Sequence, residues 1–319
     1  MKRILVTGAT GFIGRPCIDL LLEDGFDVHA ISSQAELPNL PKIVWHPVDL
    51  HDHSGVKQIL ARVRPAFLLH SAWYVKHGDH WSSKENLRWV SSSLHLAEEF
   101  IKHGGEKLVC LGTCAEYDWN ELPPLKSIYE ESRPLRPHTI YGASKASLFM
   151  MLEALCKNED IDFVWARPFG PYGFYDNPKR LIPHTVLSLL QGEIMICNNP
   201  EFVRNFTFVN DIAQILVQLL QGKTLGAINI ANGQAVKLKY VVEFVAKAVG
   251  AENLVQYRPN SANGTEPAVL VADVKKLKDE IGHVAPTSLE DGLERSIGWW
   301  REKLGMSQKS IVSIGNKFI

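Results

Sequence analysis

A tyrosine and a lysine four residues apart are the first side chains in this sequence whose types and spacing suit proton transfer. Tyr141 and Lys145 fall in a segment, about 137–157, whose apolar pattern predicts a helix, and residues four apart lie one above the other on a helix face. A phenol with a pKa of about 10 exchanges protons poorly at neutral pH, but a neighbouring cation stabilises the phenolate. The pair therefore predicts a tyrosine that acts as general acid and base.

A threonine at the end of an apolar strand supplies the third candidate group. Thr113 follows residues 107–111, which read as a buried strand, and ligands of open α/β sheets bind at the carboxyl edge of the strands. We expect the Thr113 hydroxyl to hold a substrate oxygen while Tyr141 moves the proton. Taken singly, the tyrosine–lysine pair also fits an exposed helix face, and the threonine also fits a strand-end cap.

Three glycines near the N-terminus predict a binding turn for a dinucleotide. Residues 4–6 read as a short buried strand and residues 12–24 carry helical spacing, so Gly8, Gly11 and Gly14 fall on a strand–turn–helix. In such a turn the first glycine permits the tight bend, the second lets the backbone approach a pyrophosphate, and the third lets helix and strand pack closely. The helix N-terminus adds free N–H groups and a partial positive charge for the phosphates.

The elements that must position these groups alternate between strand and helix in the first half of the chain, which predicts a parallel sheet with helices on both faces. Further strands are expected at residues 28–32, 43–46, 66–70 and 163–168, and helices at about 54–63 and 85–103. Beyond residue 170 we expect a loop at 176–183, helices at 185–191 and 241–249, and strands at 204–209 and 227–231. Thr287 is expected to cap a final helix, with Glu290 three residues further on.

The composition is that of an ordinary globular enzyme and excludes several other classes. Of the 319 residues, 45% are hydrophobic and 22% are charged, and the formal net charge of −1 gives no electrostatic case for nucleic acid or for an anionic membrane surface. No apolar run reaches the about 18 residues of a membrane span and no signal peptide is evident, so we expect a cytoplasmic protein. The five cysteines show no metal-ligand spacing, and we expect reduced thiols and no metal site.

Taken together, these segments resemble the extended short-chain dehydrogenases/reductases that act on nucleotide sugars as epimerases, dehydratases or ketoreductases. The resemblance rests on segments in family order from residue 1 to about 300: 7–14, 49–50, 70–72, Asn86, 112–113, 141–145, 167–173, 204–211 and 288–292. It implies a doubly wound parallel sheet of the Rossmann type with a smaller, mixed α/β substrate domain. The implied division is 1–169 plus 204–232 for the dinucleotide-binding domain, 170–203 plus 233–306 for the nucleotide-sugar-binding domain, and 307–319 as a tail.

The resemblance also implies a role for each matching residue. Tyr141 would be the general acid and base, Lys145 would orient the nicotinamide ribose and tune Tyr141, and Thr113 would polarise the sugar oxygen. Arg204 would pair with the substrate diphosphate, a task that suits a planar guanidinium, and Arg180 is a weaker second candidate. The implied cofactor-binding residues are Gly8, Gly11, Phe12, Ile13, Gly14, Asp49, Leu50, Ser71, Ala72, Trp73, Tyr141, Lys145 and Pro168. A homodimer through two helices, about 85–103 and 137–157, is implied as well.

The end of the second strand departs from the pattern of NAD enzymes. Where an acidic residue usually binds the ribose 2′-hydroxyl, this chain has Ser32 and Ser33, and Arg15 follows the last glycine of the turn. Two hydroxyls and a guanidinium favour a 2′-phosphate, so we expect NADP(H) as the cofactor, with NAD(H) as the alternative.

The residues after Thr113 depart from two other reactions of the family. Its 4,6-dehydratases carry Asp-Glu there, whereas this chain has Cys114 and Ala115, and Glu116 comes one place late and is expected to point elsewhere. Family members that epimerise beside a ketone carry a cysteine and a histidine at the positions of Ala115 and Tyr175. Dehydration, and epimerisation combined with reduction, are therefore disfavoured.

We therefore expect NADPH-dependent reduction of a nucleotide-linked 4-keto-6-deoxyhexose, with Tyr141 as the proton donor. The first alternative is an NAD-dependent nucleotide-sugar 4-epimerase that keeps its cofactor bound. The second is a non-catalytic, NADP-sensing regulator, which would have no need of Thr113, Tyr141 and Lys145 together.

Overall fold

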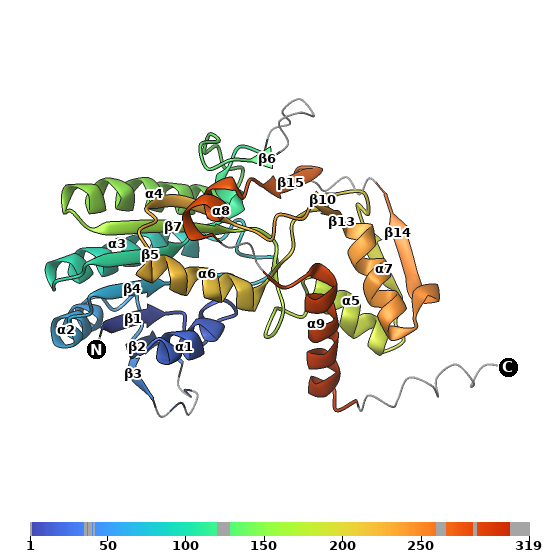
Figure 1. The fold of residues 1–319 in the computed structure, drawn as a ribbon, viewed down its shortest axis with the longest axis horizontal. Helices are drawn as coiled ribbons and strands as arrows, with labels where there is room; N and C mark the ends of the chain where they lie inside the picture. Colours follow the sequence, from blue (N-terminus) through green and yellow to red (C-terminus); the bar gives the residue numbers. More distant parts are fainter. Residues whose placement is uncertain are drawn as a thin grey trace.

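The computed structural model describes residues 2–34, 37, 40, 42–119, 128–259, 266–282 and 286–306. Within them, a parallel sheet of seven strands forms one half of the molecule (Figure 1). In order across the sheet the strands are β12 (Gly226–Ile230), β7 (Asp162–Pro168), β5 (Lys107–Leu111), β4 (Phe67–His70), β1 (Arg3–Thr7), β2 (Asp27–Ser32) and β3 (Ile43–Pro47). The chain order reverses between β4 and β1, the point at whose carboxyl edge such sheets bind ligands.

Helices cover both faces of this sheet. On one face α1 (Gly14–Glu23) packs against α6 (Val209–Gln221). On the other face lie α2 (His53–Val63), α3 (Glu85–Lys102) and α4 (Ile140–Asn158) (Figure 1). The expected doubly wound parallel sheet is therefore confirmed.

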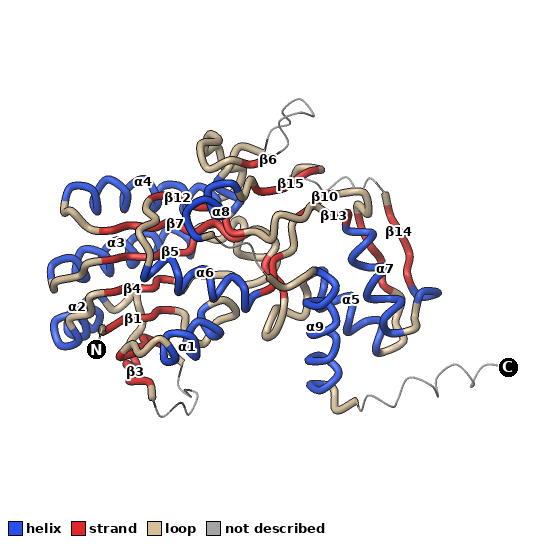
Figure 2. The backbone as a smooth tube through the Cα atoms, in the orientation of Figure 1, coloured by secondary structure: helices blue, strands red, loops and turns tan. Residues whose placement is uncertain are grey.

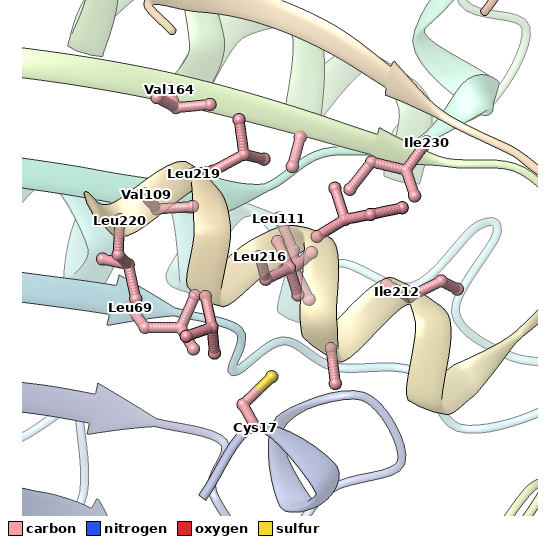
Figure 3. Packing of buried hydrophobic residues seen from close by; sticks show 14 of the residues in the cluster. Cys17, Leu69, Val109, Leu111, Val164, Ile212, Leu216, Leu219, Leu220 and Ile230 are labelled. Carbon is pink, nitrogen blue, oxygen red and sulfur yellow. The ribbon is translucent and has the colours of Figure 1, made fainter. Parts of the chain in front are cut away.

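Strand β5 contributes side chains to the apolar clusters on both faces of the sheet. Val109 and Leu111 join the apolar cluster of α1 and α6, whereas Leu108 and Cys110 join that of α2, α3 and α4. Side chains alternate along a strand, and continuous apolar runs are typical of strands that are covered on both faces. Figure 3 shows the first cluster, to which α6 contributes Ile212, Leu216, Leu219 and Leu220.

A second group of helices surrounds its own apolar cluster, away from α2 and α3 (Figure 2). Its helices are α5 (Leu181–Leu190), α7 (Leu238–Val249) and α9 (Leu289–Lys303), and a strand pair, β9 (Met195–Asn198) and β14 (Val255–Arg258), lies beside them. A mixed sheet joins β13 (Val236–Lys237), β10 (Val203–Arg204), β15 (Val269–Ala272) and β6 (Ile128–Tyr129). The remaining elements are β8 (Pro171–Tyr172), β11 (Thr207–Phe208), α8 (Lys275–Ile281) and the 3₁₀ turns η1 (Cys114–Glu116) and η3 (Glu252–Leu254).

The strand expected at 204–209 is wrong, because the chain breaks there into two short strands. β10 ends at Arg204, β11 covers Thr207–Phe208, and α6 begins at once at Val209, a helix that the apolar pattern did not reveal. Asn205 explains the break: its amide donates to the Gln234 carbonyl (2.8 Å) and accepts from the Ala272 N–H (2.7 Å). The side chain thus takes over the bonds that a continuous strand would make through its backbone.

Helix starts were also misplaced by a few residues. Ser288, not Thr287, caps α9 by accepting from the Asp291 N–H (3.1 Å), while the Thr287 hydroxyl donates to Asp211 of α6 (2.8 Å). Thr139 caps α4, which begins at Ile140 rather than near 137, and α5 begins at Leu181 within the expected loop. The expected domain division stays a prediction, and its tail, 307–319, lies outside the described residues.

None of the described helices combines the length and the apolar character needed to cross a membrane.

Two glycines of α9 provide a test of how this helix packs. A Cβ on Gly292 would lie 2.0 Å from the Tyr172 hydroxyl, whereas a Cβ on Gly298 has nothing within 4 Å. We expect Gly292→Ala to lower the free energy of unfolding by about 1–3 kcal/mol through overpacking. Gly298→Ala should instead raise it by up to about 1 kcal/mol through helix propensity. Urea denaturation followed by circular dichroism measures both, and equal effects would contradict the packing described.

Candidate active site

The glycine turn after β1 is packed so closely that its first and third positions admit no side chain. Gly8 has φ +72°, and a Cβ there would lie 2.7 Å from the Ala72 nitrogen. A Cβ on Gly14 would lie 2.3 Å from the Gly8 carbonyl oxygen, and the Gly11 N–H donates to that same oxygen (2.9 Å). The turn therefore brings the N-terminus of α1 to the carboxyl edge of the sheet, where its free N–H groups fit a pyrophosphate.

The other cofactor-binding candidates follow strand ends, which in a parallel sheet meet at one edge. Ser71, Ala72 and Trp73 follow β4, Ser33 follows β2, Asp49 and Leu50 follow β3, Phe12 and Ile13 precede α1, and Ser32 and Pro168 end β2 and β7. The structure thus gathers along a single edge residues that are spread over most of the first half of the chain. Their contacts with a cofactor stay a prediction.

A buried histidine ties the ends of β1 and β4 together below this edge. His70 shares hydrogen bonds with the Thr7 hydroxyl (2.7 Å) and with the Ser93 hydroxyl (2.8 Å). Burial, reinforced by the charge of Lys145, lowers the pKa of His70 to about 3. His70 is therefore neutral at ordinary pH and has a structural part in holding the edge, rather than a part in proton transfer.

Thr113 and Tyr141 meet at the end of β5. The Thr113 side chain acts on the Tyr141 phenol and opposes the rise in its pKa, and the Thr113 side-chain oxygen accepts from the Ala115 N–H (3.2 Å). Burial raises the pKa of Tyr141, so the phenol stays protonated and available as a donor. That these two hydroxyls share one ligand oxygen stays a prediction.

Lys145 lies one turn further along α4, in a tightly defined position. Its ammonium donates to the Leu111 carbonyl (2.7 Å) and lies 3.8 Å from the centroid of the Trp73 ring. The Trp73 indole is held in turn by Asn86, whose side-chain oxygen accepts from it (2.8 Å). Burial lowers the pKa of Lys145 to about 8, an effect that the charge of Glu116 opposes.

An aromatic wall beside Tyr141 was not foreseen from the sequence. His80 and Trp81 contact the Tyr141 ring edge-on, with centroids 5.1 and 5.6 Å away. Trp119 lies 6.2 Å from Trp81 and donates to the Cys114 carbonyl (3.1 Å). These residues come from irregular segments without periodicity, so no pattern in the sequence could have assembled them.

The two candidate arginines act on different members of this group. Arg180 forms an ion pair with Asp176 (2.8 Å), lies 5.6 Å from the Phe12 ring of the glycine turn, and is close enough to Tyr141 to lower its pKa. Arg204 pairs with Glu266 (3.2 Å), and its charge acts on Cys114. Arg180, the weaker candidate from the sequence, is therefore the one whose charge reaches the phenol.

The Arg15 guanidinium contacts an aromatic ring. Its guanidinium lies 3.9 Å from the centroid of the Tyr175 ring, and Tyr175 in turn contacts Trp299 of α9 (5.0 Å). The Ser32 hydroxyl accepts from the Gln34 N–H (3.2 Å). In this arrangement the guanidinium that the sequence suggested for a 2′-phosphate is stacked on an aromatic ring.

The residues after Thr113 do not present a carbon base. Glu116 is fully buried and forms an ion pair with Arg167 (2.7 Å), which confirms that it points away from the edge. Burial raises the pKa of the Cys114 thiol to about 12, so this thiol stays protonated.

Comparison with known proteins agrees with this geometry. Residues 4–231 match the NAD dependent epimerase/dehydratase family. The chain belongs to this family. Membership confirms the resemblance stated above and makes the chain an enzyme of the nicotinamide dinucleotide-dependent class.

Individual members of the family are distant in sequence but similar over nearly the whole chain. The UDP-glucuronic acid decarboxylase 1 of Xenopus tropicalis is 25% identical over 313 residues, which span 95% of this chain and 73% of the decarboxylase. The UDP-glucose 4-epimerase of Thermotoga maritima, solved with UDP-glucose, superposes with a TM-score of 0.84 at 23% identity, covering 95% of this chain and 99% of that one. The UDP-glucose 4-epimerase of Thermus thermophilus, solved with NAD, has a TM-score of 0.81 at 25% identity, covering 94% and 99%.

Proposed function

We propose that the chain reduces the keto group of a nucleotide-linked 4-keto-6-deoxyhexose. The observation that carries this proposal is the interaction of the Thr113 side chain with the Tyr141 phenol beside a buried Lys145, together with the ion pair of Glu116 with Arg167, which withdraws that carboxylate from the site. When bound, the reduced nicotinamide supplies the hydride for the carbonyl carbon. The glycine turn, into which a Cβ would not fit, suits the pyrophosphate of that cofactor.

Each of the three residues has a separate task in this reaction. The Tyr141 phenol donates its proton to the carbonyl oxygen as that oxygen becomes a hydroxyl. The Thr113 hydroxyl holds the same oxygen, and the Lys145 ammonium stabilises the phenolate that Tyr141 leaves behind. Arg204 and Arg180 suit the substrate diphosphate, since a guanidinium can donate two parallel hydrogen bonds to phosphate oxygens.

A nucleotide-sugar 4-epimerase is the second candidate, and the similar epimerase structure with NAD favours it. An epimerase must retain its own hydride through the cycle and therefore holds its cofactor without exchange. Absorbance of the cofactor released on denaturation distinguishes the two: stoichiometric NAD indicates an epimerase, and an empty or exchanging site indicates a reductase. A purely regulatory protein would oxidise no reduced cofactor across a panel of keto-sugar nucleotides.

For the cofactor, the contact of Arg15 with Tyr175 leads us to propose NAD(H) in place of the NADP(H) expected from the sequence. A 2′-phosphate needs a cation, and the guanidinium next to the glycine turn is stacked on an aromatic ring. The ribose hydroxyls would then lie against Ser32 and Ser33. The NAD bound in the similar epimerase supports this choice.

The first prediction concerns Tyr141. We expect Tyr141→Phe to lower kcat by about 10²–10⁴-fold, the usual worth of a general acid, and to leave cofactor affinity nearly unchanged. Steady-state kinetics with a 4-keto-6-deoxyhexose nucleotide and a fluorescence titration with cofactor measure the two effects. Tyr240→Phe, at an exposed tyrosine of α7, is the control. Undiminished turnover in Tyr141→Phe would remove the mechanism.

The second prediction concerns Arg15. We expect kcat/KM to be higher with NADH than with NADPH, and Arg15→Ala to change this ratio by less than about threefold, the scale of an exposed interaction. A selective loss of NADPH use in Arg15→Ala, by about tenfold or more, would restore the 2′-phosphate assignment.

The third prediction concerns association of two copies through α3 and α4, which pack against each other and expose Leu87 (60%), Met150 (54%) and Met151 (51%). Adjacent exposed apolar side chains of this kind mark interaction surfaces. We expect the chain to be a dimer by light scattering and Met150→Glu with Met151→Glu to make it a monomer. Ile194→Glu, at an equally exposed residue before β9, should leave the mass unchanged, and a monomeric wild type would refute the interface.

A further inference from the structure

A buried carboxylate lies directly beneath the candidate active site. Glu116 has no exposed surface and accepts hydrogen bonds from the Thr113 N–H (2.7 Å), the Trp165 indole (2.9 Å) and the Arg167 Nε (2.7 Å). Burial raises the pKa of Glu116, and Arg167 and the N–H donors oppose that effect. Because all of these partners are donors, the geometry fits the ionised carboxylate.

The carboxylate and Thr113 form a reciprocal cap around η1. Glu116 accepts from the Thr113 N–H while the Thr113 oxygen accepts from the Ala115 N–H (3.2 Å). Because a hydroxyl has one hydrogen and two lone pairs, Thr113 keeps its hydrogen and one lone pair for other partners. The cap thus fixes the position of Thr113.

The charge of Glu116 also reaches the acid–base pair. The groups that act on the pKa of Lys145 are Glu116 and Cys110. The charge of Lys145 in turn lowers the pKa of His70 at the end of β4. The groups that act on Tyr141 are Thr113, Cys114, Glu116 and Arg180. Burial raises the pKa of both the Cys110 and the Cys114 thiol, so both are neutral at ordinary pH. Among the groups that act on the pair, Glu116 therefore supplies the negative charge.

We propose that Glu116 is a positioning residue of this site: its cap holds Thr113 in place, and its buried charge acts directly on Tyr141 in favour of the neutral phenol and on Lys145 in favour of the ammonium. The proposal rests on the proposed reduction, in which Tyr141 must be protonated before hydride transfer. A carboxylate that faces the core would thus act on the site without touching substrate.

The sign of the effect follows from the charges. Replacing Glu116 by glutamine removes a negative charge and leaves Arg167 in place, so the pKa of Lys145 falls, and the direct effect on the pKa of Tyr141 is in the same direction. Removing a charge that acts on these groups in the protein interior is expected to shift the pKa by about one unit. The alkaline limb of the kcat profile for reduction should move to lower pH by a similar amount, since the deprotonated phenol cannot donate.

The decisive measurement is the pKa of Lys145 in the cofactor-free chain, followed by NMR of ¹³Cε-labelled lysine. The resonance is assigned by its loss in Lys145→Met. We expect a pKa of about 8 in the wild type, a value lower by about one unit in Glu116→Gln, and no change in Glu131→Gln. Glu131 is a matched control because it is half-buried, accepts from the Asn229 N–H (2.8 Å), and does not act on Lys145 or Tyr141.

Two further variants test whether an effect of Glu116→Gln comes from a loss of folding, from the charge of Glu116 or from the position of its carboxylate. Because Glu116→Gln leaves the buried Arg167 without its counter-charge, Glu116→Gln combined with Arg167→Met removes both charges. The Lys145 pKa should still fall in this double variant, because the charge that acts on Lys145 is that of Glu116. Glu116→Asp keeps the charge but shortens the side chain, so the Lys145 pKa should stay near that of the wild type while kcat falls. A Lys145 pKa that is unchanged in a folded chain carrying Glu116→Gln overturns the proposal.

The pH profile of reduction, together with the Lys145 pKa, distinguishes an error in the role proposed for Glu116 from an error in the proposed function. If the wild type reduces the keto sugar but neither its alkaline limb nor the Lys145 pKa responds to Glu116→Gln, the role of Glu116 is wrong and the function stands. If no keto-sugar nucleotide is reduced while the Lys145 pKa still falls, the function is wrong and the influence of Glu116 on the pair stands.

Discussion

The functional edge of this molecule depends on the close approach of two backbone segments that are far apart in the sequence. The turn after β1 touches the residues after β4 so tightly that a single Cβ on Gly8 would lie 2.7 Å from both the Ala72 nitrogen and the Ser71 hydroxyl. The Ser71 hydroxyl donates across this contact to the Thr7 carbonyl (2.7 Å). Because β5 pairs with β4, the same contact fixes the distance from the glycine turn to Thr113.

Polar groups beneath the edge hold this arrangement in place. His70 links β1 and β4 to α3, and Glu116 links the end of β5 to Arg167 of β7. Hydrogen bonds in an interior of low dielectric constant are electrostatically stronger than in water, but a lost partner is correspondingly costly. The edge is therefore specified by a few polar contacts between neighbouring strands, in addition to the apolar packing of the helices on either face.

The parts of the structure that could be predicted are those encoded locally. The strand–turn–helix around Gly8, the four-residue spacing of Tyr141 and Lys145, and the place of Thr113 after a strand all follow from short stretches of sequence. The helix α6 was missed because it starts directly after a strand, without a capping side chain at Phe208. The aromatic wall and the partner of Glu116 depend on contacts between distant segments, which no local pattern contains.

Arg15 is a residue for which a local pattern suggested a role and a contact with a distant segment changed the interpretation. Its place in the sequence suggested a phosphate ligand, yet the residue that decides its direction, Tyr175, lies far along the chain and has φ +63°, a conformation rare outside glycine. Residue type and spacing name the chemistry a side chain can perform, whereas tertiary contacts decide whether it is free to do so.

The contacts of Arg15 with Tyr175 and of Tyr175 with Trp299 have a consequence for the order in which the structure can form. Trp299 of α9 contacts Tyr175, and Tyr175 contacts Arg15 in the first turn of α1, so α9 is linked to the glycine turn through one intervening ring. Synthesis from the N-terminus would finish the sheet strands well before this support exists. A fragment that ends before α9 would therefore contain the glycine turn but lack the contact of Trp299 with Tyr175.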